Sequence, residues 1–116
     1  MDTRSKGRKA ELEYSLILES EGYLVERVKG AVKFSKSVDF FGIADLIAIG
    51  ADGVRLIQVK SNGSCGAIKK LARWKIENES KLPPVLMLFV VARFDGNSKR
   101  KPYWKTWEIG EIQAIN

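Results

Sequence analysis

The sequence predicts an α+β domain in which a central mixed β-sheet is flanked by helices. With 116 residues, the chain is long enough for one hydrophobic core but not for two. Two segments have the apolar spacing of amphipathic helices, and the segments around them have the alternating or continuously apolar pattern of strands. Because these elements follow one another as α-β-β-β-α-β-β with no linker, residues 1–116 are expected to form a single domain.

The first helix is expected at residues 5–21. Ser5 is a suitable N-cap, and Gly22 stands where helices often end on a left-handed glycine. Residues 23–28 alternate between two sets of side chains and predict the first strand. Residues 29–42 show no periodicity, so we expect a loop there.

A β-hairpin is expected next, because two nearly continuous apolar runs flank a turn sequence. The runs are residues 44–49 and 54–60, and the turn is Ala51-Asp52-Gly53. The polar residues 61–66 then predict a loop.

The second half of the chain predicts a basic helix followed by two strands. The helix is expected at residues 67–80, where Pro83-Pro84 ends it. Residues 85–94 are almost entirely apolar and predict a buried strand, and residues 103–109 alternate as a last strand does. The polar residues 95–101 connect these two strands.

Composition limits the chemistry that this chain can perform. It contains no histidine and a single cysteine, Cys65. Catalysis by Cys–His or Ser–His pairs, zinc sites with the usual ligands and an internal disulfide are therefore excluded. A chemical site must use carboxylates, amides, hydroxyls and lysines. No secretory signal or long apolar run is visible, so we expect an intracellular, cytoplasmic protein without membrane association.

The formal net charge is +6, and the cationic residues gather in separate clusters. Such clusters suit a surface that follows a phosphate backbone, although a generally solvated basic protein is the simpler alternative. The clusters with expected DNA contacts are Arg4, Lys6, Arg8 and Lys9 at the start and Lys69, Lys70 and Arg73 in the second helix. A further basic group comprises Lys99, Arg100, Lys101 and Lys105.

Three polar residues interrupt the apolar runs of the expected hairpin. A carboxylate such as Asp45 is costly inside a strand unless it is paired or binds a metal. Because strand side chains alternate, Gln58 and Lys60 share one face, and the hairpin can bring Asp45 beside them. A buried ion pair between Asp45 and Lys60 is the structural alternative.

This set of residues has a chemical use. Asp45 and Gln58 offer oxygen ligands of the kind that Mg²⁺ prefers, the Val59 carbonyl is a further candidate, and Mn²⁺ is an expected substitute. The cation would acidify a water and stabilise charge on a scissile phosphate. Lys60 would orient the water, help to deprotonate it or stabilise the developing charge, and the sequence does not choose among these roles.

Asp45, followed after twelve residues by Gln58-Val59-Lys60, resembles the D…(D/E)xK signature of the PD-(D/E)xK nuclease superfamily. The start of the chain is also similar to that of archaeal-type Holliday-junction resolvases. In those enzymes a Lys-Gly pair precedes a helix that carries an active-site glutamate and ends at Gly-aromatic, which matches Lys6-Gly7, Glu11 and Gly22-Tyr23 here. The resemblance covers residues 4–62.

This resemblance implies a restriction-endonuclease-like fold with an α-β-β-β-α-β core. It implies a metal-dependent DNA endonuclease that makes paired, symmetric nicks in four-way junctions as a homodimer. Its implied catalytic residues are Glu11, Asp45, Gln58 and Lys60, and its implied metal ligands are the first three of these. By the same match, Ser35 and Ser37 are candidates for phosphate contacts, with plain loop polarity as the alternative. Ser61 is a candidate for a DNA contact because it directly follows Lys60.

The chain also departs from the family pattern. Gln58 stands where glutamate is usual, which removes one negative charge, and Ala44 replaces a frequent proline. Glu13 competes with Glu11, and Asp39 could approach the site from its loop. Two other functions therefore stay open: a nuclease of this fold that acts on flaps, single strands or modified DNA, and a catalytically decayed DNA-binding protein. Trp74, on the basic helix, is open between a core role and base stacking.

Overall fold

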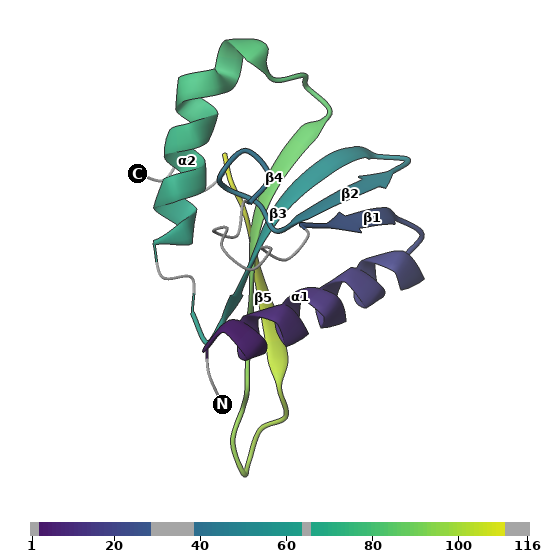
Figure 1. Ribbon diagram of the computed structural model, residues 1–116, viewed down its shortest axis with the longest axis vertical. Helices are drawn as coiled ribbons and strands as arrows, with labels where there is room; N and C mark the ends of the chain where they lie inside the picture. Colours follow the sequence, from purple (N-terminus) through teal and green to yellow (C-terminus); the bar gives the residue numbers. More distant parts are fainter. Residues whose placement is uncertain (1–2, 29–38, 64–65, 111–116) are drawn as a thin grey trace, which may run out of the picture.

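The structure is a computed structural model that describes residues 3–28, 39–63 and 66–110 (Figure 1). It contains two α-helices, one 3₁₀ helix and one five-stranded sheet with the strand order β1-β2-β3-β4-β5. The helices are α1 (Thr3–Ser20), α2 (Ala67–Asn78) and η1 (Glu79–Lys81). The strands are β1 (Leu24–Arg27), β2 (Leu46–Gly50), β3 (Gly53–Ser61), β4 (Leu86–Phe94) and β5 (Tyr103–Glu108).

The sheet is mixed, as the sequence predicts. Strands β1, β2 and β3 pair antiparallel, β3 and β4 pair parallel, and β4 and β5 pair antiparallel. A parallel pair needs a long crossover connection, and α2 lies in the connection between β3 and β4. Beyond the helices, the loop between β4 and β5 extends away from the body of the domain (Figure 1).

Helix α1 ends as predicted but begins earlier. Gly22 has φ 98°, its N–H donates to the carbonyl of Glu19, and the Tyr23 N–H donates to the carbonyl of Leu18. This pair of bonds is a Schellman C-cap, which a left-handed glycine favours. The predicted N-cap at Ser5 is wrong, because the helix already begins at Thr3. No proline or glycine before Ser5 stops the first turn from extending, and helix ends vary by a residue or two.

Two hydrophobic cores form, one on each face of the sheet. Helix α1 packs on the face that carries Leu46, Ala48, Ile57, Val59, Phe89 and Val91. Helix α2 covers the other face, which carries Ala44, Leu56, Leu88 and Val90. Strand β3 lies at the centre of the sheet, so its residues alternate between the two cores. Gln58 and Lys60 follow Leu56 in this alternation, which places them on the α2 face.

We predict that Gly53→Ala destabilises the protein more than Gly22→Ala does. Both glycines have positive φ, but an added Cβ meets nothing at Gly22, whereas at Gly53 it would clash with the Val85 carbonyl. We expect a loss of about 1 kcal/mol for Gly22→Ala and of at least about 2 kcal/mol for Gly53→Ala. Urea unfolding midpoints of the two variants give the comparison. Equal losses would show that the hairpin relaxes around the added methyl.

Candidate active site

Asp45 lies directly before β2, and its backbone is fixed on both sides. Its N–H donates to the Ile57 carbonyl at 2.8 Å, and its own carbonyl accepts from the Val28 N–H at 2.9 Å. These bonds continue the pairing of β2 with β3 and with the end of β1. The position of Asp45 is therefore set by the sheet.

The Asp45 carboxylate is buried, with 5% of the residue exposed. Its Oδ2 accepts one hydrogen bond from Gln58 Nε2 at 2.8 Å and another from the Val59 N–H at 2.9 Å. Two donors from neighbouring positions of β3 thus hold one oxygen. The side chain has a defined orientation at the end of the hairpin.

Gln58 lies opposite Asp45 and is equally buried, at 5% exposed. Its Nε2 is used in the bond to Asp45, but its Oε1 is buried and has no hydrogen-bond partner among the described residues. A buried carbonyl oxygen without a donor loses free energy unless something else satisfies it. A cation or an ordered water would supply what this oxygen lacks.

Two further carboxylates approach Asp45 from other parts of the chain. Glu11 comes from α1, and Asp39 comes from the turn before β2. Burial raises the pKa of Asp45 to about 7; the Val59 N–H bond opposes this rise, while the Glu11 and Asp39 charges and a hydrogen bond with Asp39 add to it. Burial also raises the pKa of Glu11. Glu11 is predicted from the resemblance to the resolvases. The approach of Asp39 to Asp45 is shown by the folded chain.

Arg27 is a charged residue of this region that the sequence does not single out. Its guanidinium lowers the pKa of Glu11, as does that of Arg8, and its buried Nε has no partner among the described residues. The signal was present in the alternation of β1, where Arg27 shares a face with Tyr23 and Val25. Both of those pack against the α1 core, so Arg27 is a cation at an inward position.

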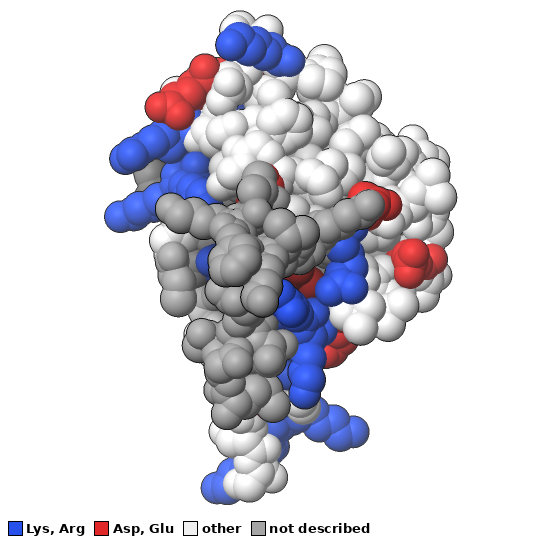
Figure 2. Space-filling view, in the orientation of Figure 1, with Lys and Arg blue, Asp and Glu red and all other residues white. Residues whose placement is uncertain are grey.

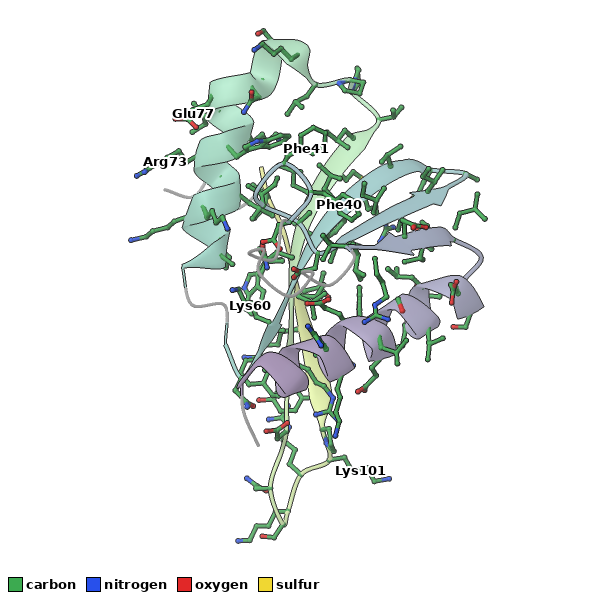
Figure 3. The ribbon with its side chains drawn as sticks, in the orientation of Figure 1. Phe40, Phe41, Lys60, Arg73, Glu77 and Lys101 are labelled. Carbon is green, nitrogen blue, oxygen red and sulfur yellow. The ribbon has the colours of Figure 1, made fainter. Side chains whose placement is uncertain are left out.

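Lys60 and Ser61 end β3 on opposite faces of the sheet. Lys60 is half-buried on the face that also carries Gln58, in the middle of the view in Figure 3. The Ser61 hydroxyl is buried and has no partner within the described part of the chain. The predicted DNA contact of Ser61 would therefore require a local rearrangement.

The side-chain atoms at this site that could bind a metal are all oxygens, which are the ligands that Mg²⁺ and Mn²⁺ prefer. Within residues 3–28, 39–63 and 66–110, no three His, Cys, Asp or Glu side chains converge closely enough to hold a metal ion. A cation here would depend on the free Gln58 oxygen and on retained waters as well as on Asp45. Magnesium sites with few protein ligands and several waters have this composition.

The predicted DNA-binding residues lie on both helices. Arg8 and Lys9 are exposed on α1, and Lys69, Lys70 and Arg73 are exposed on α2. Figure 2 shows Lys and Arg side chains gathered over α2 and along the lower part of the molecule. Ser35 and Ser37 lie outside the described residues, as do the side chains of Arg4 and Lys6.

None of the described helices is both long enough and apolar enough to cross a membrane.

Comparison with known proteins identifies the fold. No family model matches this chain, and no curated protein sequence matches it significantly. Among solved structures, the chain is similar to Hjc from Archaeoglobus fulgidus, a Holliday junction resolvase from an archaeal hyperthermophile. The TM-score is 0.56 at 16% identity, and the match covers 88% of this chain and 76% of that one. The predicted α+β class with its restriction-endonuclease-like arrangement is confirmed.

We predict that Asp45→Asn stabilises the metal-free protein, and that the gain increases with pH. Because the pKa of Asp45 rises from 3.8 unfolded to about 7 folded, its contribution to stability is complete below pH 3.8 and is lost as pH rises through 7. Asparagine keeps an acceptor for the Val59 N–H and carries no charge. Melting temperatures in EDTA should differ by several degrees at about pH 8 and by little at about pH 4.

Asp52→Asn is the matched control for this prediction. The Arg55 guanidinium lowers the pKa of Asp52, so its loss should give no stability gain at high pH. If Asp45→Asn melts below the wild type at both pH values, the negative charge of Asp45 does not destabilise the metal-free protein.

Proposed function

We propose that this chain is a divalent-cation-dependent DNA endonuclease that cuts four-way junctions. The observation that carries the proposal is the meeting of Asp45 and Gln58 at the end of the β2–β3 hairpin, with Lys60 on the same sheet face and Glu11 close by. The similarity of the fold to that of a Holliday junction resolvase supports the choice of substrate. The basic surface supports DNA as the partner.

Asp45, Gln58 and Glu11 are the residues that would hold Mg²⁺, with Mn²⁺ as a substitute. When bound, the cation supplies an acidified water and neutralises charge on the scissile phosphate. Gln58 Nε2 and the Val59 N–H keep one oxygen of Asp45 in place. Asp45 must lose its proton for this function, so metal binding should weaken below about pH 7.

Lys60 contributes a cation on the face where the phosphate would lie. Its ammonium group would donate hydrogen bonds to a phosphate oxygen or to the attacking water. The exposed cations of α1 and α2 would bind flanking phosphates, and because the two helices cover opposite faces of the sheet, they offer contacts on both sides of the hairpin end. Contacts of this kind position DNA without reading its sequence.

A DNA-binding protein without catalysis is the second candidate, and one observation favours it. The hydrogen bond from Gln58 Nε2 satisfies Asp45 in the absence of any metal, as an ordinary buried amide–carboxyl pair would. Cleavage assays with site variants separate the two functions.

We predict that Asp45→Asn and Lys60→Ala each reduce cleavage by at least about a hundredfold, while DNA affinity in EDTA changes little. The assay compares magnesium-dependent cleavage rates with binding measured by fluorescence anisotropy. Gln58→Glu is the matched variant: it adds a carboxylate where only an amide oxygen is free, so it should stay active and reach half-maximal rate at lower Mg²⁺. A folded Asp45→Asn protein that cuts at the wild-type rate would refute the site.

We also predict selectivity for branched DNA. Two symmetric nicks in a four-way junction need two copies of the site related by a twofold axis, so the active species should be a dimer. Light scattering measures the mass in solution, and cleavage mapping on an immobile junction shows whether the nicks are paired. Equal cleavage of linear duplex, flap and single strands by a monomer would assign the site to another substrate.

A further inference from the structure

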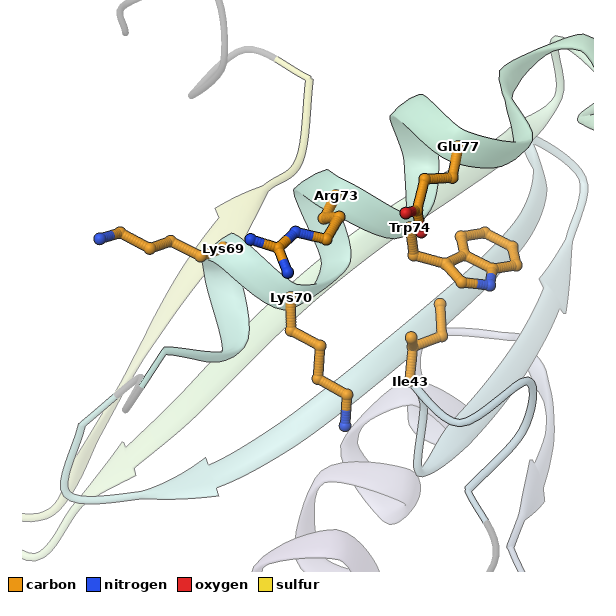
Figure 4. Close-up of a pocket in the computed structure, with 6 residues that line it drawn as sticks. All are labelled: Ile43, Lys69, Lys70, Arg73, Trp74 and Glu77. Atoms are coloured by element: carbon orange, nitrogen blue, oxygen red, sulfur yellow. The ribbon is translucent and has the colours of Figure 1, made fainter.

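A pocket of about 400 Å³ opens between α2 and the turn before β2 (Figure 4). This volume is in the range of sites that hold small organic ligands. Its lining combines three cations, one acid and two apolar side chains: Lys69, Lys70, Arg73, Glu77, Ile43 and Trp74. In Figure 4, Lys70 extends to the side of the helix on which Ile43 and the Trp74 ring lie, whereas Lys69 points away.

An exposed aromatic ring lies against this pocket. Phe41 is 70% exposed, and its ring centroid is 5.8 Å from that of Trp74 with the planes tilted by 45°. Trp74 itself is only partly buried against the α2 core. The two rings therefore present aromatic surface to solvent beside a group of cations.

The backbone at Phe41 is held in an unfavourable conformation. Its φ of 54° lies in the left-handed region, which costs free energy for any residue with a Cβ. The core gains little in return, since most of the ring stays in water. Strain of this kind without a packing benefit is found where a side chain is presented to a ligand.

The same turn carries an acid of the candidate active site. Asp39 lies at the start of this turn and Asp45 directly after it, and the Phe40 N–H donates to the Ala44 carbonyl at 2.8 Å, which closes the turn that holds Phe41 at its tip. Figure 3 shows Phe40 and Phe41 on this turn, with Lys60 below them. A ligand in the pocket would therefore lie beside the cleavage site.

We propose that this pocket holds one unpaired nucleotide of a bound DNA strand. The base would stack on the Phe41–Trp74 surface, and Lys70 and Arg73 would bind the adjoining phosphates. Glu77 is the acceptor available for an exocyclic amine of the base. A duplex hides the faces of its bases, so the pocket selects strands with an unstacked base, as at a branch point or a flap. The proposal deepens the nuclease function and rests on it for the identity of the ligand.

The test measures binding in EDTA, with a fluorescein-labelled oligodeoxycytidylate and a duplex of the same length as probes. Phe41→Ala should weaken binding of the single strand about tenfold and leave duplex binding nearly unchanged. Phe41→Trp should restore single-strand affinity. Because Phe41 is mostly exposed, its replacement should not impair folding, and Ile76→Ala is the control for loss of an exposed apolar side chain from α2.

Neutralisation of the cations gives a second measurement. The double variant Lys70→Gln/Arg73→Gln should weaken the binding of both probes. For the single strand, the slope of log affinity against log salt concentration should flatten by about 0.7 for each lost phosphate contact. Lys81→Gln, which lies outside the pocket, should change neither quantity. Equal effects of Phe41→Ala on both probes, or no effect on either, would overturn the nucleotide pocket. So would a change from dimer to monomer in the Phe41→Ala protein, because the ring would then cover a second copy of the chain.

Failure of the nucleotide-pocket proposal can be distinguished from failure of the nuclease proposal. If the wild type cuts junctions and Phe41→Ala binds and cuts as the wild type does, the pocket is wrong and the nuclease stands. If the wild type cuts no DNA but Phe41→Ala selectively loses single-strand binding, the pocket stands and the nuclease is wrong. A wild type that binds neither probe refutes both.

Discussion

Strand β3 has a backbone N–H at Val59 that lies past the last pair of the β2–β3 ladder, and the Asp45 carboxylate accepts its hydrogen bond. A buried N–H must find a partner, so this bond fixes the point at which the hairpin ends. The same oxygen accepts from Gln58, which is itself buried in the sheet. One carboxylate thus completes the backbone pairing and forms the centre of the candidate site. Its burial is the reason that its pKa is raised to about 7.

The two hydrophobic cores position different charged residues around this carboxylate. Helix α1 packs on one face and brings Glu11 toward it, while α2 packs on the other face and carries the exposed cations Lys69, Lys70 and Arg73. Because β3 is central, it cannot shift without disturbing both cores. The site residues on β3 are therefore held by the packing of the whole domain, which is the condition for preorganised chemistry.

The similarity to an archaeal resolvase extends over most of this chain at an identity of only 16%. Many sequences satisfy one pattern of buried and exposed positions, so a fold persists where side chains have been replaced. Function depends on the few groups at the site, and among these Gln58 leaves two functions open. Its Nε2 donates to Asp45, and its Oε1 has no partner among the described residues. Gln58 can therefore act as a weak metal ligand through Oε1, or it can form a buried amide–carboxyl pair with Asp45 in a protein without catalysis.

The sequence by itself determined the order of helices and strands, the hairpin around Asp52 and Gly53, and the placement of Gln58 and Lys60 on one face. These features follow from local periodicity and turn chemistry, both of which are present in short stretches of the sequence. It also indicated Asp45, because an acid in an apolar strand needs a partner. The tertiary structure decided which groups meet that acid. The approach of Asp39 to Asp45, of Arg27 to Glu11 and of Phe41 to Trp74 depends on how α1, α2 and the turn before β2 pack on the sheet, and no local pattern encodes such distances.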